Sequence, residues 1–248
     1  TPVLNPISVG HVGVSVLIVA LCGYATSGRI ARLLRALLVI LSVVVIVASV
    51  SRGPILAALV AVALLAVRSR GRAGGSLGVV AVRVVLIGGA IAAIVLMVNY
   101  LEEIGIIDVV SRLTDTLQDV ASQERAAMIT GAWQQFTERP LTGSAFVELR
   151  FMENPHNIVL ESLMALGVAG LGLLLISMGA SLVAAAQVLR ATSRHAWVAL
   201  LYLQYLVNAM LSGSLFTDSA FWFYGLGVMA LARVLRESPG KLASDGGR

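Results

Sequence analysis

Residues 154–189 read NPHNIVLESLMALGVAGLGLLLISMGASLVAAAQVL, and this stretch decides the fold. Glu161 is its only charged side chain beyond the opening NPHN. One straight helix crosses a bilayer with roughly 20 residues, and this apolar run is longer. We therefore predict a membrane helix that either projects its first turns outward or kinks near Gly167, Gly170 and Gly172.

The rest of the chain shares this apolar character. Of its 248 residues, 58% are apolar and 12% are charged, and the mean hydropathy is +0.92. In soluble domains about 25% of residues are charged. We predict an all-α protein, a polytopic transmembrane helix bundle. The pI of about 10.0 does not indicate a nucleic acid partner, because the basic residues form short clusters between apolar runs.

Seven candidate spans divide the chain. They cover roughly residues 8–25, 33–50, 54–67, 77–98, 158–189, 196–212 and 219–235. These spans divide the chain into four segments. Spans one to four occupy residues 1–98, a large loop occupies 99–155, spans five to seven occupy 156–236 and a tail occupies 237–248. The chain starts without a charged leader or a cleavage site. We therefore expect further spans before residue 1.

The basic residues alternate with the spans and predict the orientation. Of the 18 lysines and arginines, 13 fall in one set of connections and 5 in the other. The positive-inside rule places the larger set, and with it the C-terminus, in the cytoplasm. The loop 99–155, with nine of the 13 acidic residues, then lies outside. We expect a multi-pass protein of the cytoplasmic membrane whose active face is extracytoplasmic.

The loop contains one strong helix signal, SQERAAMITGAWQQFTERPLTG at residues 122–143. Ser122 is a suitable N-cap and Pro140 stops the helix. Arg125 precedes the predicted apolar face by one turn, and Arg139 lies within about 40° of it. That face comprises Ile129, Ala132, Trp133 and Phe136. Such a helix either lies on the lipid surface or packs across the ends of the spans, where Arg125 would point toward a site.

Arg52 and His156 are candidates at the outer surface. Arg52 stands nearly alone in a tight turn between two spans. It either reaches lipid phosphates or binds a pyrophosphate through bidentate hydrogen bonds. His156 stands where the loop re-enters the membrane, and it is either a hydrogen-bonded structural residue or a general base.

Glu161 is a further candidate, because a carboxylate one turn inside an apolar helix suggests function. It shares a helix face with Asn157 and is expected to orient His156 or to pair with Arg52 or Arg125. The loop carboxylates Glu102, Glu103, Asp108, Asp115 and Asp119 are expected to form a solvated face. No metal-ligand cluster, phosphate-cradling loop or nucleotide fingerprint is visible in the sequence, so neither a metal nor a cofactor is expected.

These residues resemble the O-antigen ligase and O-antigen polymerase superfamily over about residues 35 to 235. The resemblance rests on an ordered set of short motifs rather than on one long match. They are Ser51-Arg52-Gly53, Arg125 with Trp133 and Pro140-Leu141-Thr142-Gly143, His156-Asn157, Leu160-Glu161, Gly167 with Gly170, and Phe221-Trp222.

The resemblance implies a metal-independent glycosyltransferase without a nucleotide-sugar donor. Its donor is a glycan on a polyprenyl pyrophosphate carrier, such as undecaprenyl pyrophosphate, at the outer face of the membrane. The acceptor is lipid A–core for a ligase or another carrier-linked unit for a polymerase.

The resemblance also implies roles for individual residues. Arg52 and Arg125 would hold the pyrophosphate, and His156 would deprotonate or orient the acceptor hydroxyl. Asn157 and Glu161 would support the histidine, with Glu161 as part of the catalytic group. Arg139 and Trp133 are further candidates for substrate binding.

Two alternatives stay open. Ligase and polymerase are not separated by the sequence. A transporter or flippase of lipid-linked polysaccharide is the rival class, although ionisable groups near the middle of the spans, typical of transporters, are scarce here.

Overall fold

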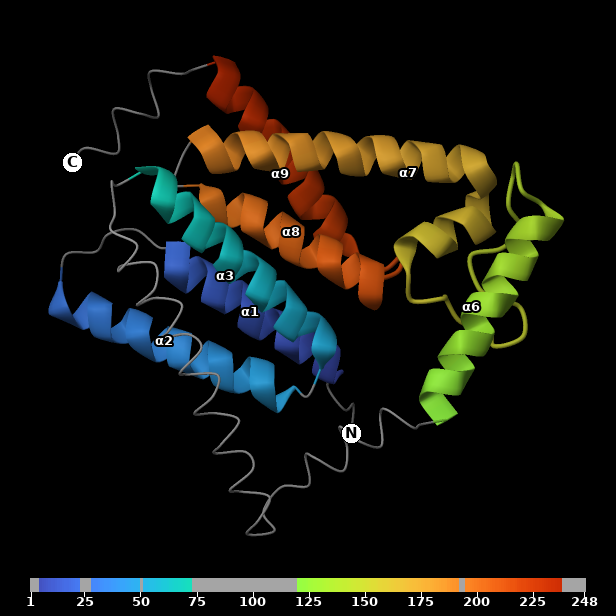
Figure 1. Ribbon diagram of the computed structural model, residues 1–248, viewed down its shortest axis with the longest axis horizontal. Coiled ribbons are helices and arrows are strands. Elements are labelled where there is room, and N and C mark those ends of the chain that lie inside the picture. The colour runs from blue at the N-terminus through green and yellow to red at the C-terminus, as the bar shows by residue number, and fades with distance from the viewer. Residues whose placement is uncertain (1–4, 23–27, 50, 73–119, 192–194, 238–248) are drawn as a thin grey trace, which may run out of the picture.

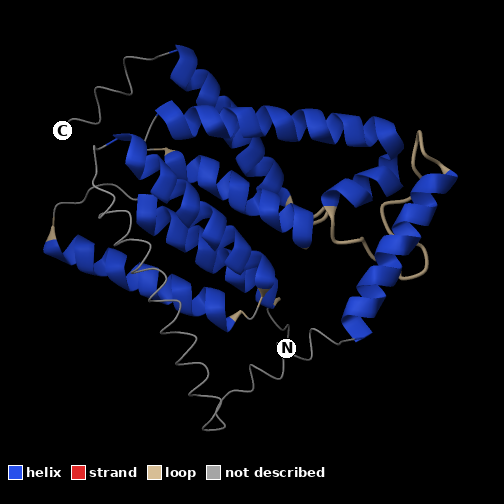
Figure 2. Cartoon of the chain, viewed as in Figure 1, coloured by secondary structure: helices blue, strands red, loops and turns tan. Residues whose placement is uncertain are grey.

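The computed structural model describes residues 5–22, 28–49, 51–72, 120–191 and 195–237 (Figure 1). Within these ranges the chain forms helices and no strand, which confirms the all-α prediction (Figure 2). The helices are α1 (Pro6–Cys22), α2 (Arg29–Ala48), α3 (Arg52–Arg72), α6 (Val120–Glu138), α7 (Ile158–Ala191), α8 (Ala196–Leu211) and α9 (Ser219–Glu237).

Six of the seven predicted spans coincide with a described helix, whereas the span predicted at 77–98 lies outside the described residues. By length and composition, α2 and α7 are the described helices that suffice to cross a membrane. Apolar but shorter helical stretches occupy Pro6–Cys22, Arg52–Ala66 and Ala196–Leu211. The helical architecture is therefore confirmed, and the count of seven spans stays a prediction.

Two apolar cores meet at α8, which lies between them in the bundle (Figure 1). Tyr202 and neighbouring residues of α8 pack against α7 and α9. Leu200 and Leu201, on another side of α8, pack against α1, α2 and α3. The first half of α8 is therefore buried between the two halves of the bundle, and its C-terminal end is half-buried.

The predicted kink in α7 is confirmed at Gly167, where φ is 64° and ψ is −161°. The loop before α7 fills the break, because the amide of Val168 donates to the carbonyl of Pro140 over 2.8 Å. A Cβ at Gly167 would stand 2.5 Å from the carbonyl carbon of Leu141, and one at Gly143 would stand 2.2 Å from that of Ala165. The two glycines therefore let two backbone segments cross in direct contact, which only residues without a Cβ allow.

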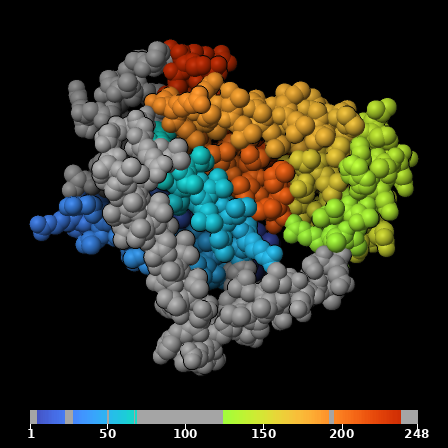
Figure 3. Space-filling model, viewed as in Figure 1, coloured from blue at the N-terminus to red at the C-terminus, as the bar shows by residue number. Residues whose placement is uncertain are grey.

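The helix α6 lies on the flank of the bundle beside the first turns of α7 (Figure 3). Glu148, which is 2% exposed, holds it there. A Cβ at Gly131 would stand 2.3 Å from the Glu148 carboxylate, and Gln135 accepts a hydrogen bond from the amide of Leu149 over 2.9 Å. The helix therefore docks through a glycine and a glutamine, in addition to apolar contacts.

Two predictions about α6 are wrong in detail. The helix begins at Val120, so Ser122 lies inside it and is not the N-cap. Ile129 and Trp133, which belong to the predicted apolar face, are 43% and 52% exposed, so this face as a whole is not the buried one. The buried residues are Met128, Gly131, Ala132 and Gln135, so the buried face is rotated about the helix axis relative to the predicted one. The polar contacts to the loop around Glu148 fix this rotation.

Candidate functional site

Arg125 connects α6 to the end of α8. Its Nη2 donates a hydrogen bond to the carbonyl of Leu211, the last residue of α8. A cation at this position satisfies one of the carbonyls that a helix leaves free at its C-terminus and also interacts favourably with the helix dipole. A guanidinium has five N–H donors, so this contact leaves most of them available for a ligand.

His156 occupies a strained turn at the start of α7. Its φ is 52°, in the left-handed region that non-glycine residues rarely adopt. The side chain of Asn154 accepts a hydrogen bond from its amide over 3.1 Å. A strained backbone of this kind persists only where the surroundings hold it in place, and such residues cluster at functional sites.

Asn157 provides that support. Its Oδ1 accepts hydrogen bonds from the amides of Val159 and Leu160 at 3.1 and 3.0 Å, so it caps α7. Its Nδ2 donates to the carbonyl of Met210 over 2.8 Å. Through these bonds the turn that carries His156 is joined to the same end of α8 that receives Arg125.

Glu161 is fully buried and faces the turn between α8 and α9. Its two carboxylate oxygens accept hydrogen bonds from the hydroxyl of Ser214 at 3.0 Å and from the amide of Leu215 at 2.7 Å. The expectation that it pairs with Arg52 or Arg125 is therefore wrong. The carboxylate instead positions the segment that leads to α9.

Asp218 lies at the end of that segment, and the sequence analysis missed it. It is 8% exposed, and Asn208 donates a hydrogen bond to it over 3.0 Å. Burial raises the pKa of the Asp218 carboxyl, while hydrogen bonds from Asn208 and from the backbone of Phe221 lower it. The reasoning that selected Glu161, a carboxylate at the boundary of an apolar span, applies equally to Asp218.

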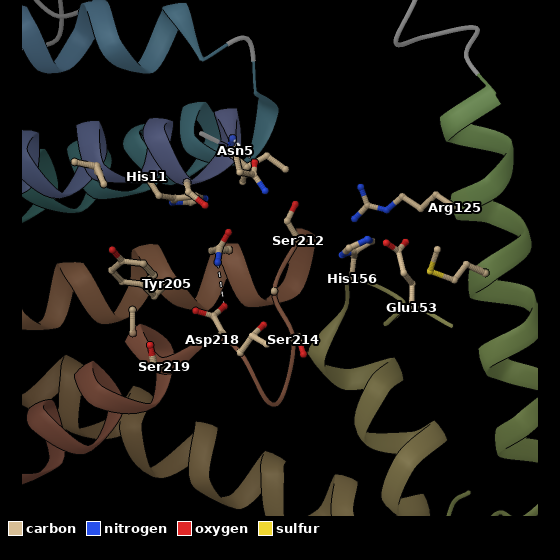
Figure 4. Close-up of a pocket in the computed structure, with 18 of the residues that line it drawn as sticks. Asn5, His11, Arg125, Glu153, His156, Tyr205, Ser212, Ser214, Asp218 and Ser219 are labelled. Carbon is tan, nitrogen blue, oxygen red and sulfur yellow. Dashed lines mark hydrogen bonds between the residues drawn. The ribbon is translucent and has the colours of Figure 1, made fainter. Parts of the chain in front are cut away.

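These elements enclose a cavity of about 690 Å³ (Figure 4). One side, which we name the loop wall, comes from α6 and the segment before α7. It consists of Glu124, Arg125, Met128, Glu153 and His156. The other side, the helix wall, comes from the start of α1, the end of α8 and the turn before α9. Its residues are Asn5, Ile7, Ser8, His11, Val12, Tyr205, Asn208, Ser212, Gly213, Ser214, Thr217, Asp218, Ser219 and Ala220.

The cavity combines groups that suit anion binding and proton transfer. On the loop wall, Arg125, Glu153 and His156 point toward one another (Figure 4). Asp218 lies across the cavity from them. An arginine can bind an anionic ligand, and a histidine can accept a proton. In the described ranges no group of three or more histidine, cysteine or acidic side chains is arranged to hold a metal ion.

The structure brings together some of the predicted site residues but not all of them. Arg125 and His156 both line the cavity. Asn157 and Glu161 do not line it, but they form hydrogen bonds with the segments that build its walls. Arg139 is exposed just beyond the end of α6, roughly 21 Å along the helix from Arg125. Arg139, the exposed Trp133 and Arg52, the first residue of α3, are not among the residues that line the cavity.

The described helices and the polar cavity at their ends define an all-helical protein with a site beside apolar helices. The sequence model of the O-antigen ligase family matches residues 37–175, more than half of the chain. The chain belongs to the O-antigen ligase family, a family of membrane enzymes that transfer glycosyl groups in surface polysaccharide biosynthesis. No curated protein and no solved structure matches the chain.

Proposed function

We propose that this protein transfers a glycan from a polyprenyl diphosphate carrier to an acceptor hydroxyl at the outer face of the cytoplasmic membrane. It would act as a surface-polysaccharide polymerase or as a ligase. The C-terminus would then lie in the cytoplasm, and membrane lipids would surround the bundle. One observation carries this proposal: Arg125 and His156, from separate elements of the loop, meet in one cavity beside apolar helices.

The geometry supports a division of roles. His156 would accept the proton of the acceptor hydroxyl as its oxygen bonds to the anomeric carbon of the donor sugar. The bond from that carbon to the diphosphate oxygen breaks, and the diphosphate leaves with the electron pair. Arg125 would stabilise the charge of this leaving group through its free N–H donors. Asp218 and Glu153 are placed to bind sugar hydroxyls.

The position of the cavity supports a reaction at the membrane surface. The N-terminal ends of α1, α7 and α9 and the C-terminal end of α8 contribute to its walls. The charge pattern predicts that all of these ends lie outside. A lipid-linked donor moving in the outer leaflet would reach this end of the bundle, and an acceptor sugar would approach it from the aqueous side.

A transporter or flippase of lipid-linked polysaccharide is the alternative. Such proteins commonly carry a substrate site at broken helices near the middle of the membrane. Here the break at Gly167 is occupied by the protein's own backbone at Pro140 and Leu141. This observation favours the transferase.

The test uses His156→Ala and Arg125→Ala in the full-length protein, expressed in a strain that lacks it. Surface glycan and carrier-linked intermediates are analysed together with membrane abundance. We expect both variants to insert normally, to lose mature glycan and to accumulate carrier-linked units on the outer face. Single units would identify a polymerase, and long chains on the carrier would identify a ligase.

Arg139→Ala is the matched control, since this arginine is exposed at the far end of α6. It should retain glycan output if the cavity is the site. Loss of output equal to that of Arg125→Ala would place substrate outside the cavity. Full output from His156→Ala and Arg125→Ala would refute the site, and intermediates confined to the cytoplasmic face would identify a flippase.

A further inference from the structure

The helix wall contains a second histidine, His11, which lies outside the segment that the family model matches. The start of α1 packs closely on the turn between α2 and α3. A Cβ at Gly10 would stand 2.6 Å from the side chains of both Pro54 and Ser49. This close approach places His11 between α8 and the first turn of α3. It therefore lies on the opposite side of the cavity from His156 (Figure 4).

His11 is 4% exposed, and Gln204 of α8 contacts both its backbone and its ring. The amide nitrogen of Gln204 donates to the His11 carbonyl over 2.7 Å and lies 3.5 Å from His11 Nδ1. The carbonyl contact requires that the nitrogen of Gln204, rather than its oxygen, faces His11. Because an amide nitrogen only donates hydrogen bonds, we assign Nδ1 as the acceptor, which places the proton of the neutral ring on Nε2.

The Nε2 atom is a buried donor with no hydrogen-bond partner among the described residues. A Cβ at Gly53 would stand 3.6 Å from it, so the missing side chain leaves space directly beside the donor. Gly53 follows Arg52 at the N-terminus of α3. An unsatisfied buried N–H group is costly and rare, which indicates that a ligand atom satisfies it.

The surroundings of this donor favour an anionic acceptor. The first turn of α3 contains no acidic residue, and its free amides carry the partial positive charge of a helix N-terminus. Arg52 adds a full positive charge at the same point. A phosphate oxygen is an anionic acceptor of the kind that helix N-termini bind.

We propose that His11 binds a phosphate oxygen of the lipid-linked diphosphate through Nε2, at a subsite shared with Arg52 and the first turn of α3. This inference rests on the proposed function, since it requires a diphosphate-bearing donor. It would also give Arg52, which does not line the cavity, a part in the site. His11 would then be a substrate-binding residue on the wall opposite His156.

The test measures binding of geranylgeranyl diphosphate to the purified full-length protein in detergent, by titration and by the ligand-dependent rise in Tm. His11→Leu should weaken binding by about tenfold or more, because a hydrogen bond to a charged group is lost. His11→Gln, which can present an N–H donor near the same place, should recover most of the affinity. Gly53→Ala should also weaken binding, because its methyl group fills the space beside Nε2.

Gly53→Ala keeps the proposal testable if His11→Leu fails to fold, because alanine is compatible with a helix. Unchanged diphosphate binding in Gly53→Ala and in folded His11→Leu would overturn the assignment. A His11-dependent rise in Tm with phosphatidylglycerol as large as that with the diphosphate would identify a bilayer lipid instead and would also overturn it. Geranylgeraniol, which has no phosphate, should give no rise that depends on His11.

The two proposals fail in different ways. His156→Ala should bind the diphosphate normally while losing glycan transfer. Wild-type protein that binds no diphosphate would overturn both the carrier and the role of His11. Wild-type binding that the His11 and Gly53 variants leave unchanged would overturn the role of His11 alone.

Discussion

The two walls of the cavity are built by different means. Backbone geometry shapes the loop wall: two glycines with positive φ cross where the loop enters α7, and His156 itself has a positive φ. Side-chain hydrogen bonds shape the helix wall, through Glu161 to the turn before α9, Asn208 to Asp218 and Gln204 to His11. The loop wall therefore tolerates few changes of backbone, and the helix wall tolerates few changes of polarity.

The two walls also differ in how far they can be predicted from sequence motifs. The crossing glycines and the His156 turn belong to local motifs, so the loop wall could be predicted in part. The helix wall joins residues almost 200 positions apart, such as His11 and Gln204. Four variants test the comparison between the walls, beginning with the one expected to have the largest effect.

Gly143→Ala should be the most damaging change, because it breaks the base of the loop wall. The new Cβ would stand 2.2 Å from the Ala165 carbonyl carbon at a φ of 69°. Backbone cannot move aside cheaply, so we expect a loss of roughly 4 kcal/mol or more, or failure to fold. Thermal unfolding in detergent measures it. Gly172→Ala, where a Cβ would meet nothing within 4 Å, is the control and should be neutral or stabilising.

Glu161→Ala should have the next largest effect, because it removes the link from α7 to the helix wall. It leaves the Ser214 hydroxyl and the Leu215 amide without their acceptor, at a cost of roughly 3 kcal/mol. Glu161→Gln retains one acceptor oxygen and should lose about half as much. Equal Tm values for wild type and Glu161→Ala would contradict the positioning role. Glycan output at a temperature where both variants stay folded would show whether Glu161 also takes part in the reaction.

Much of the fold follows from the sequence, because apolar runs mark membrane helices strongly. Six predicted spans coincide with described helices, and the kink falls at Gly167 as expected. The helix ends were less predictable. The helix α2 begins at Arg29 rather than at residue 33, because helical hydrogen bonding continues through basic residues that hydropathy scores as loop.

The candidate site was predicted only in its loop wall. The positions of Arg125 on the loop helix and of His156 before an apolar run selected both residues, and both line the cavity. Hydropathy assigned Trp133 to the apolar face of its helix, yet the buried side includes Gln135, which bonds to the loop. Asp218 and His11 could not be placed, since only the packing of α1, α8 and α9 brings them to one cavity.

His156→Gly should separate the backbone role of this residue from its chemical role. Glycine adopts a φ of 52° without strain, whereas alanine does not. We expect His156→Gly to be more stable than His156→Ala by about 1 kcal/mol, with both variants inactive in glycan transfer. Thermal unfolding and glycan analysis of the same preparations test this. Equal stability of the two variants would mean that the turn relaxes once the imidazole is gone, so that the histidine itself causes the strain.

Asp218→Asn should give the smallest effect, and a pH-dependent one. Burial raises the pKa of the Asp218 carboxyl above its ordinary value of 3.8, so the folded protein binds this proton more tightly than the unfolded chain. The resulting stabilisation is complete below about pH 4 and is lost as the pH rises through the raised pKa. The asparagine variant lacks this titration but keeps an oxygen for Asn208. The Tm difference, variant minus wild type, should therefore grow with pH across this window and persist at high salt, because burial rather than surface charge causes it. Parallel Tm curves would mean that Asp218 stays hydrated at the cavity surface. Water would then reach the part of the helix wall that its hydrogen bonds indicate to be closed to solvent.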